Sequence, residues 1–283
     1  MANLRKVLFV SLCHFLRWPT NPRMYLLLIL LAGYINMMLY PVRDFCAQYN
    51  VAISPWVFPC LMAEPYSLLM VMLGVVLLFC DAPFLDEEQP YVILRAGRLC
   101  WCAAQILYMV MATIVYFLVV FLLTVVLLLP HVQFSADWGV AINTLAQTDL
   151  GFQAGVALPF PSEIMLRLSP LQAIGAELGM ASWIGVFLGL VMFTLNALFN
   201  RGVGAIAATA FAVFPLFIRQ TDWGLHYFSP VSWASLVVLD FSGNTTMPSV
   251  YYAAGVLAVA CAALILLDVW IVKKQNIEVI KSI

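Results

Sequence analysis

Apolar residues form long uninterrupted runs along this chain, and polar stretches separate the runs at a few places. A helix needs about 20 mostly apolar residues to cross the hydrocarbon of a bilayer. Six segments meet or approach that length, at residues 24–40, 58–80, 99–129, 171–199, 203–217 and 250–272. The runs are too long and continuous for the alternating strands of a membrane barrel. The pattern therefore predicts an all-α polytopic membrane protein with six transmembrane helices.

The composition agrees with a chain that is surrounded by lipid. Of the 283 residues, 64% are hydrophobic and 10% are charged, whereas soluble domains carry roughly 25% charged residues. The formal net charge of −1 gives no reason to expect nucleic acid as a partner. We therefore expect the lipid bilayer of the cell membrane as the main environment of the chain.

The seven cysteines do not predict a disulfide framework or a metal site. Their number is odd, and most of them lie in or beside apolar runs. Cys100-Trp101-Cys102 lacks the two-residue gap of a zinc-binding pair, and no second pair follows nearby. We expect no metal and no cofactor in this chain.

Lysine and arginine concentrate on the cytoplasmic side of membrane proteins. With a cytoplasmic N-terminus, ten of the 13 lysines and arginines fall on that side. Only Arg43, Arg167 and Arg219 fall on the other. The distribution predicts a multi-pass protein with both termini in the cytoplasm. The long external links then cover residues 130–170 and 218–249.

Residues 1–18 precede the first apolar run and have a pattern of their own. Apolar side chains recur there at helical spacing, at Leu4, Leu8, Leu12 and Phe15. This spacing favours an amphipathic helix on the cytoplasmic membrane face. The alternative is an extension of the first span, but Pro19 and Pro22 favour a break. We therefore divide the chain into the helix of residues 1–18 and a transmembrane domain of residues 19–283.

The densest charged stretch, DAPFLDEEQPYVILRAGR, covers residues 81–98 between the second and third spans. Asp86 can cap a short helix, with Glu87 and Glu88 in its first turn, where carboxylates favour the positive end of the helix dipole. Residues 91–94 supply an apolar surface, and Arg95 and Arg98 follow it. The segment predicts a cytoplasmic helix that docks into a groove on a soluble protein. The alternative is an ordinary solvated loop.

Motifs for catalysis are missing. The sequence has no GxxxxGK[ST] phosphate loop, no HExxH and no GxSxG, so we do not expect an enzyme. The pair Glu87-Glu88 resembles the paired glutamates of intramembrane CAAX-type proteases. That family places an arginine after its pair and three intervening residues, however, where this chain has Val92, and its later histidines are missing too.

Three acidic residues in or beside the apolar runs raise the alternative of an ion-coupled secondary transporter. These are Glu64, Glu177 and Asp268. Such carriers place ionisable groups in mid-membrane, but each of the three is expected near the end of a span. Snorkelling or interfacial pairing, for example of Asp268 with Lys273, is the other explanation. The helix that carries Glu177 has a clear start, with Ser169 as cap, Pro170 first and Gln172 at the capping-box position.

Three motifs carry a family resemblance. DAPF…YVILRAGR, NALFNRG at the end of the fourth span and FSPVSWASL before the sixth are similar to bacterial type 2 ABC-transporter permeases with no assigned substrate. The layout of spans and surface helices resembles the same family. The link of residues 130–170 is longer than in the simplest members.

The resemblance implies a mechanical role. It implies a second permease, identical or related, as the partner in a homodimer or heterodimer, and separate ATPase subunits that hold ATP and Mg²⁺. The segment of residues 81–98 would be the coupling helix that receives the ATPase motion. The implied coupling residues are Phe84, Asp86, Glu87, Glu88, Tyr91, Arg95 and Arg98. The cargo would be exported and amphiphilic, such as a peptide, a lipid-like molecule or a drug.

Overall fold

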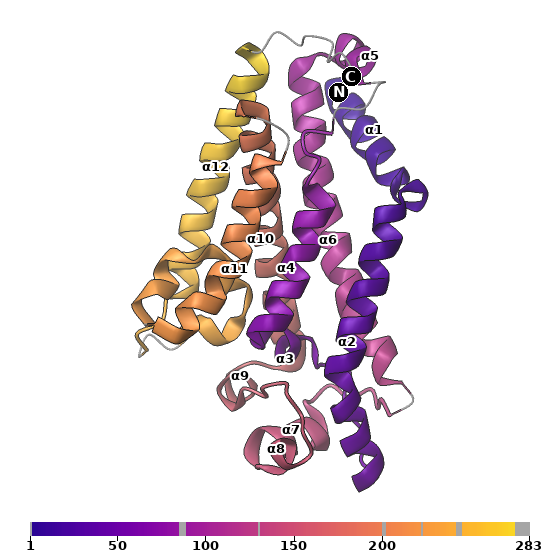
Figure 1. The fold of residues 1–283 in the computed structure, drawn as a ribbon, viewed down its shortest axis with the longest axis vertical. Helices are drawn as coiled ribbons and strands as arrows, with labels where there is room; N and C mark the ends of the chain where they lie inside the picture. Colours follow the sequence, from indigo (N-terminus) through magenta and orange to yellow (C-terminus); the bar gives the residue numbers. More distant parts are fainter. Residues whose placement is uncertain are drawn as a thin grey trace.

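The structure is a computed structural model, and it describes residues 2–84, 89–129, 131–199, 202–221, 223–241 and 245–274. These ranges fold as a bundle of helices that run roughly along one long axis, and they contain no strand (Figure 1). Four helices are long and apolar enough to cross a membrane: α2 (Pro22–Tyr49), α6 (Arg98–Leu128), α10 (Pro170–Leu198) and α12 (Val250–Lys274). The chain therefore has the build of an all-α membrane protein.

Helix α10 forms the centre of the bundle. In its most apolar stretch 67% of the residues are buried inside the protein, against 28–33% in the other three long helices. It packs against α4, α6, α11 and α12. The start of α10 is as predicted, because Ser169 and Gln172 form a capping box in which the Ser169 N–H donates to Gln172 Oε1 at 3.1 Å.

The two remaining apolar helices, α4 (Pro65–Phe79) and α11 (Val203–Thr221), are shorter. Residues 58–80 do not form the one helix that was expected, because α3 (Phe58–Ala63) ends before α4 begins. Glu64 is extended between them, with ψ of 120°. Pro65 explains the break, since its ring disfavours helical geometry in the preceding residue. The crossing of a membrane by α4 and α11 stays a prediction.

Helix α2 is longer than its predicted span. It continues through Pro41 to Tyr49, nine residues beyond the predicted end of the span at residue 40. Val42, Phe45 and Cys46 are buried beyond the proline. Their packing explains why the loss of one backbone hydrogen bond at Pro41 does not end the helix.

Helix α1 (Ala2–Leu16) is separated from α2 by the short η1 (Trp18–Thr20). Its face with Leu4, Leu8 and Leu12 is exposed. Ser11 and His14, which lie beside these leucines on the helix surface, are buried, and α1 packs along α6. Phe15, the fourth residue of the predicted pattern, is half-buried and packs against the core. The position of α1 on a membrane surface stays a prediction.

The bundle has two distinct ends (Figure 1). The first, here called the α5 end, holds α5 (Gln89–Ala96), the start of α1 and the end of α12. The opposite α7 end holds α7 (Gly139–Gln147), α8 (Leu150–Gln153) and α9 (Ser162–Arg167). Between α11 and α12, three short turns fold back into the bundle: η2 (Trp223–Phe228), η3 (Pro230–Ala234) and η4 (Leu236–Val238).

Candidate functional site: the α4–α6 connection

The connection between α4 and α6 lies at the α5 end and contains most of the chemistry singled out in the sequence. Phe84, Tyr91, Arg95 and Arg98 are among the described residues. Asp86, Glu87 and Glu88 lie outside them, so their predicted capping and docking roles stay predictions. As described, α5 begins at Gln89, after these three residues.

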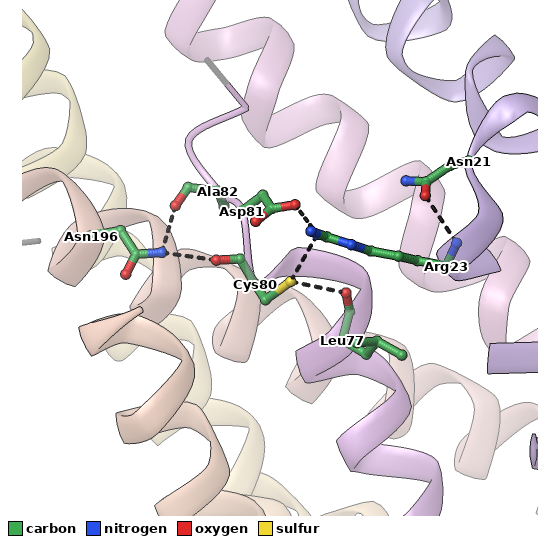
Figure 2. Close-up of polar contacts among 7 residues, drawn as sticks. All are labelled: Asn21, Arg23, Leu77, Cys80, Asp81, Ala82 and Asn196. Carbon is green, nitrogen blue, oxygen red and sulfur yellow. Dashed lines mark hydrogen bonds and ion pairs between the residues drawn. The ribbon is translucent and has the colours of Figure 1, made fainter. Parts of the chain in front are cut away.

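One buried side chain, Asn196, ties the start of this connection to the α10–α11 connection. Its Nδ2 donates to the carbonyl oxygens of Cys80 at 3.2 Å and Ala82 at 2.7 Å (Figure 2). Its Oδ1 accepts from the N–H groups of Gly202 at 3.2 Å and Gly204 at 2.8 Å. The amide thus uses both donor hydrogens and both acceptor lone pairs. Two loops that are far apart in sequence are fixed to each other at this point.

A residue of α2 also contacts the start of the connection. Arg23 Nη1 forms an ion pair with Asp81 Oδ2, and the same nitrogen lies 3.7 Å from Cys80 Sγ (Figure 2). The Asn21 side chain caps α2 by accepting from the Arg23 N–H at 3.0 Å, which holds the arginine backbone in place. Both partners of the ion pair are exposed, so it contributes about 0–1 kcal/mol. The pair orients the segment more than it stabilises it.

A cluster of aromatic rings holds Phe84. Its ring centroid lies 5.1 Å from that of Tyr108, 5.9 Å from that of His14 and 6.4 Å from that of Phe79. The Trp18 indole N–H donates to Tyr108 Oη at 2.8 Å, which fixes the ring of Tyr108. Through these contacts η1 and helices α1, α4 and α6 all meet at Phe84.

Helix α5 is anchored on one side and open on the other. Ile93 is 6% exposed and packs into the bundle, whereas Tyr91 and Leu94 are 72% and 82% exposed. The Lys6 ammonium donates to the Arg95 carbonyl oxygen at 3.4 Å, which ties α1 to α5. After α5, Gly97 has a φ of 87°, a left-handed geometry that favours glycine, and it starts α6. Arg98 Nη1 then donates to the Lys273 carbonyl oxygen of α12 at 3.3 Å.

The three acidic residues of the carrier alternative are not exposed, and one of them, Asp268, lies near Cys102 in the first turns of α6. Glu64 is 9% exposed and caps α4, accepting from the Ser67 N–H at 2.6 Å. Asp268 is fully buried, and its hydrogen-bond partner is Thr194 of α10 at 2.6 Å rather than Lys273. Snorkelling to a surface therefore does not describe them.

Glu177 is also fully buried, and neither carboxyl oxygen has a hydrogen-bond partner in the described part of the chain. A buried neutral group without a partner costs about 1–3 kcal/mol, whereas an unpaired buried charge costs far more. The structure therefore favours a neutral carboxyl at this position.

Metal chemistry finds no support in the described ranges. They contain no group of three or more histidine, cysteine, aspartate or glutamate side chains that could hold a metal ion. All seven cysteines are free thiols.

Comparisons with models of protein families, with curated proteins and with solved structures found no match to this chain.

The sequence did not predict that Asn196 and the Trp18–Tyr108 hydrogen bond hold this connection in place. Asn196 does carry a signal, because it is a polar amide in the last turn of an apolar helix, a few residues before Gly202. A buried amide at such a position must find partners in the neighbouring loops. No sequence signal identifies Tyr108 as the acceptor for Trp18.

Proposed function

We propose that the chain is the permease subunit of an ATP-binding-cassette transporter. It works beside a second permease, and separate ATPase subunits bind ATP and Mg²⁺. It exports an amphiphilic peptide, a lipid-like molecule or a drug. The segment of residues 81–98 is the coupling element that receives the motion of the ATPase.

The geometry of α5 carries this proposal. A short helix stands at one end of the bundle with a tyrosine and a leucine directed outward, at 72% and 82% exposure. Large apolar side chains on a rigid helix are typical anchors for a groove on a partner protein. Hydrogen bonds hold both ends of the segment: Ala82 accepts from Asn196, and Arg98 donates to the Lys273 carbonyl oxygen of α12. A push on α5 therefore reaches α10, α11 and α12.

The test is co-purification from native membranes in mild detergent, with mass spectrometry of the captured proteins. Variants with Tyr91→Ala and Leu94→Ala, singly and together, are compared with Tyr251→Ala, an exposed tyrosine at the far end of α12 (91% exposed). We expect capture of an ATPase that falls about tenfold or more in the α5 double variant and stays unchanged in Tyr251→Ala. Absence of an ATPase even after cross-linking would contradict the permease proposal.

A second candidate is an ion-coupled secondary transporter. The observation that favours it is the burial of Glu177 and Asp268, each with a carboxyl oxygen that has no hydrogen-bond partner among the described residues. Intramembrane carboxyls are costly and often functional. This candidate predicts transport without an ATPase, with a proton or sodium dependence that Glu177→Gln or Asp268→Asn abolishes.

A further inference from the structure

Glu177 lies where α10 meets the turns η3 and η4, which fold back into the bundle. The backbone N–H of Leu236, the first residue of η4, faces the carboxyl but falls short of a hydrogen bond. The preceding residue, Ser235, has a buried hydroxyl oxygen that also lacks a partner in the described part of the chain. The contact between α10 and η4 thus encloses two polar side chains without hydrogen-bond partners.

No described cation balances a charge on Glu177. The titratable side chain that faces it is the Cys60 thiol of α3, which is itself fully buried. Residues 230–238 of η3 and η4 include no titratable side chain, and neither do the turns of α10 on either side of Glu177. Glu64, at the end of α3, already caps α4. An ionised Glu177 would therefore lie in an apolar interior without a counter-ion, which favours the protonated form.

We propose that Glu177 is a proton-binding site and that its proton holds η3 and η4 against α10. With the proton bound, the carboxyl is neutral and fits the closed contact. When the proton leaves to water, the carboxylate that remains needs solvent, and solvent reaches it only if residues 230–238 move away from α10. One O–H bond breaks on release and forms on uptake, and no other bond changes.

The inference does not depend on how transport is powered, because it rests on the α10–η4 contact alone. Asp268 is the weaker candidate for the same role, since the Thr194 hydroxyl already donates to it at 2.6 Å.

The first experiment is infrared spectroscopy of the purified full chain in lipid nanodiscs. We expect a carbonyl-stretch band of a protonated carboxylic acid at pH 7 that is lost in Glu177→Gln. The band is kept in Glu163→Gln, which changes an exposed glutamate of α9 at the same end of the bundle. A spectrum at pH 7 in which no such band depends on Glu177 overturns the proposal. If Glu177→Gln fails to fold, the band is titrated in Asp268→Asn, which removes the other fully buried carboxyl. A band in that variant that persists from pH 5 to pH 9 would show that Glu177 does not release its proton in this range, and it would overturn the proposal.

The second experiment measures hydrogen exchange at the amides of residues 235–239, with protection corrected for the intrinsic effect of pH. Once the proton is lost, we expect protection in the wild type to fall by up to about tenfold for each further pH unit. Glu177→Gln, which stays neutral, is expected to keep its protection over the same range. Equal pH dependence in both proteins overturns the link between the proton and the turns. Protection at high pH that sodium restores and choline does not would assign the site to a metal cation and overturn the proton assignment.

Discussion

The side-chain amide of Asn196 donates a hydrogen bond of 2.7 Å to the carbonyl oxygen of Ala82, a residue 114 positions away in the chain. The same amide accepts from the Gly204 N–H at 2.8 Å. The end of α4 and the start of α11 are therefore connected through one side chain of α10. Any displacement of the segment that begins at Ala82 must either move α11 with it or break these bonds.

Replacement of this side chain is expected to be costly. Asn196→Ala leaves two carbonyl oxygens and two N–H groups without their partner, and a buried polar group that loses its hydrogen bond costs about 1–3 kcal/mol. Water can replace some of these hydrogen bonds at the loop ends, so we expect a total loss of about 2–4 kcal/mol in the free energy of unfolding, less than the sum for four groups. Thermal or denaturant unfolding in detergent micelles measures it.

The matched control is Asn143→Ala on α7, where the asparagine is exposed. A surface substitution of this kind changes stability by about 0.5 kcal/mol or less. Asn196→Asp keeps the acceptor oxygen but places a second carboxylate oxygen against the Cys80 and Ala82 carbonyl oxygens, so it is expected to cost at least as much as Asn196→Ala. Equal stability of Asn196→Ala and Asn143→Ala would show that the four bonds contribute nothing net.

The start of α11 also depends on a close approach that only glycine permits. A Cβ atom at Gly204 would lie 2.6 Å from the Met192 carbonyl oxygen and 2.7 Å from Met192 Cα, both backbone atoms that cannot rotate away. We expect Gly204→Ala to destabilise the fold by about 1–3 kcal/mol through overpacking. A Cβ at Gly175 meets nothing within 4 Å, so Gly175→Ala should stabilise α10 by about 0.5–1 kcal/mol. A melting temperature of Gly204→Ala above that of Gly175→Ala would be inconsistent with this packing.

The Trp18–Tyr108 bond gives a third prediction. Tyr108 is 5% exposed, so Tyr108→Phe leaves the Trp18 indole N–H without its acceptor and should cost about 1–2 kcal/mol. In a double-mutant cycle with Trp18→Phe, we expect a coupling energy of about 0.5–1.5 kcal/mol. Tyr91→Phe, at an exposed position of α5, should change stability by less than about 0.5 kcal/mol. A coupling energy near zero would mean that water replaces the phenol without loss.

The length of the apolar runs predicted the long helices well, because length and apolarity are local properties of the chain. The predicted helices of residues 99–129 and 171–199 match α6 and α10 to within one residue at each end. The failures have tertiary causes. Helix α2 continues through Pro41 because buried contacts beyond it offset the lost hydrogen bond. The break at Glu64 was readable from Pro65, but the apolar run on both sides concealed it.

The position of the candidate site in the chain was predictable, but the contacts that hold it were not. The charged segment of residues 81–98 was found from its composition, and α5 lies within it. The ties that hold it come from Arg23, Tyr108 and Asn196, on three other helices. Which distant side chains meet there depends on the packing of the whole bundle. The interior position of Glu177 could not be read from the sequence either, because a span end exposed to headgroups and one covered by turns have the same local pattern.

The thiol of Cys80 offers a chemical probe of the Arg23–Asp81 pair. Burial raises the pKa of the Cys80 thiol, the Asp81 carboxylate raises it further, and the Arg23 guanidinium partly offsets both. A raised pKa means less thiolate at a given pH and a slower reaction with maleimide. In a chain whose other six cysteines are replaced, Asp81→Asn should lower that pKa and speed labelling of Cys80 at pH 8.

The control for this probe is a chain that keeps only Cys13, an exposed cysteine on α1. Its labelling rate should not respond to Asp81→Asn. Arg23→Ala should have the opposite effect on Cys80, because it removes the one positive charge that favours the thiolate. The difference between the two variants should shrink as salt is added, since both effects act through exposed charges that ions screen. If Asp81→Asn and Arg23→Ala shift the Cys80 rate in the same direction, altered access to the thiol and not electrostatics governs labelling, and the pair does not act on Cys80 as charges.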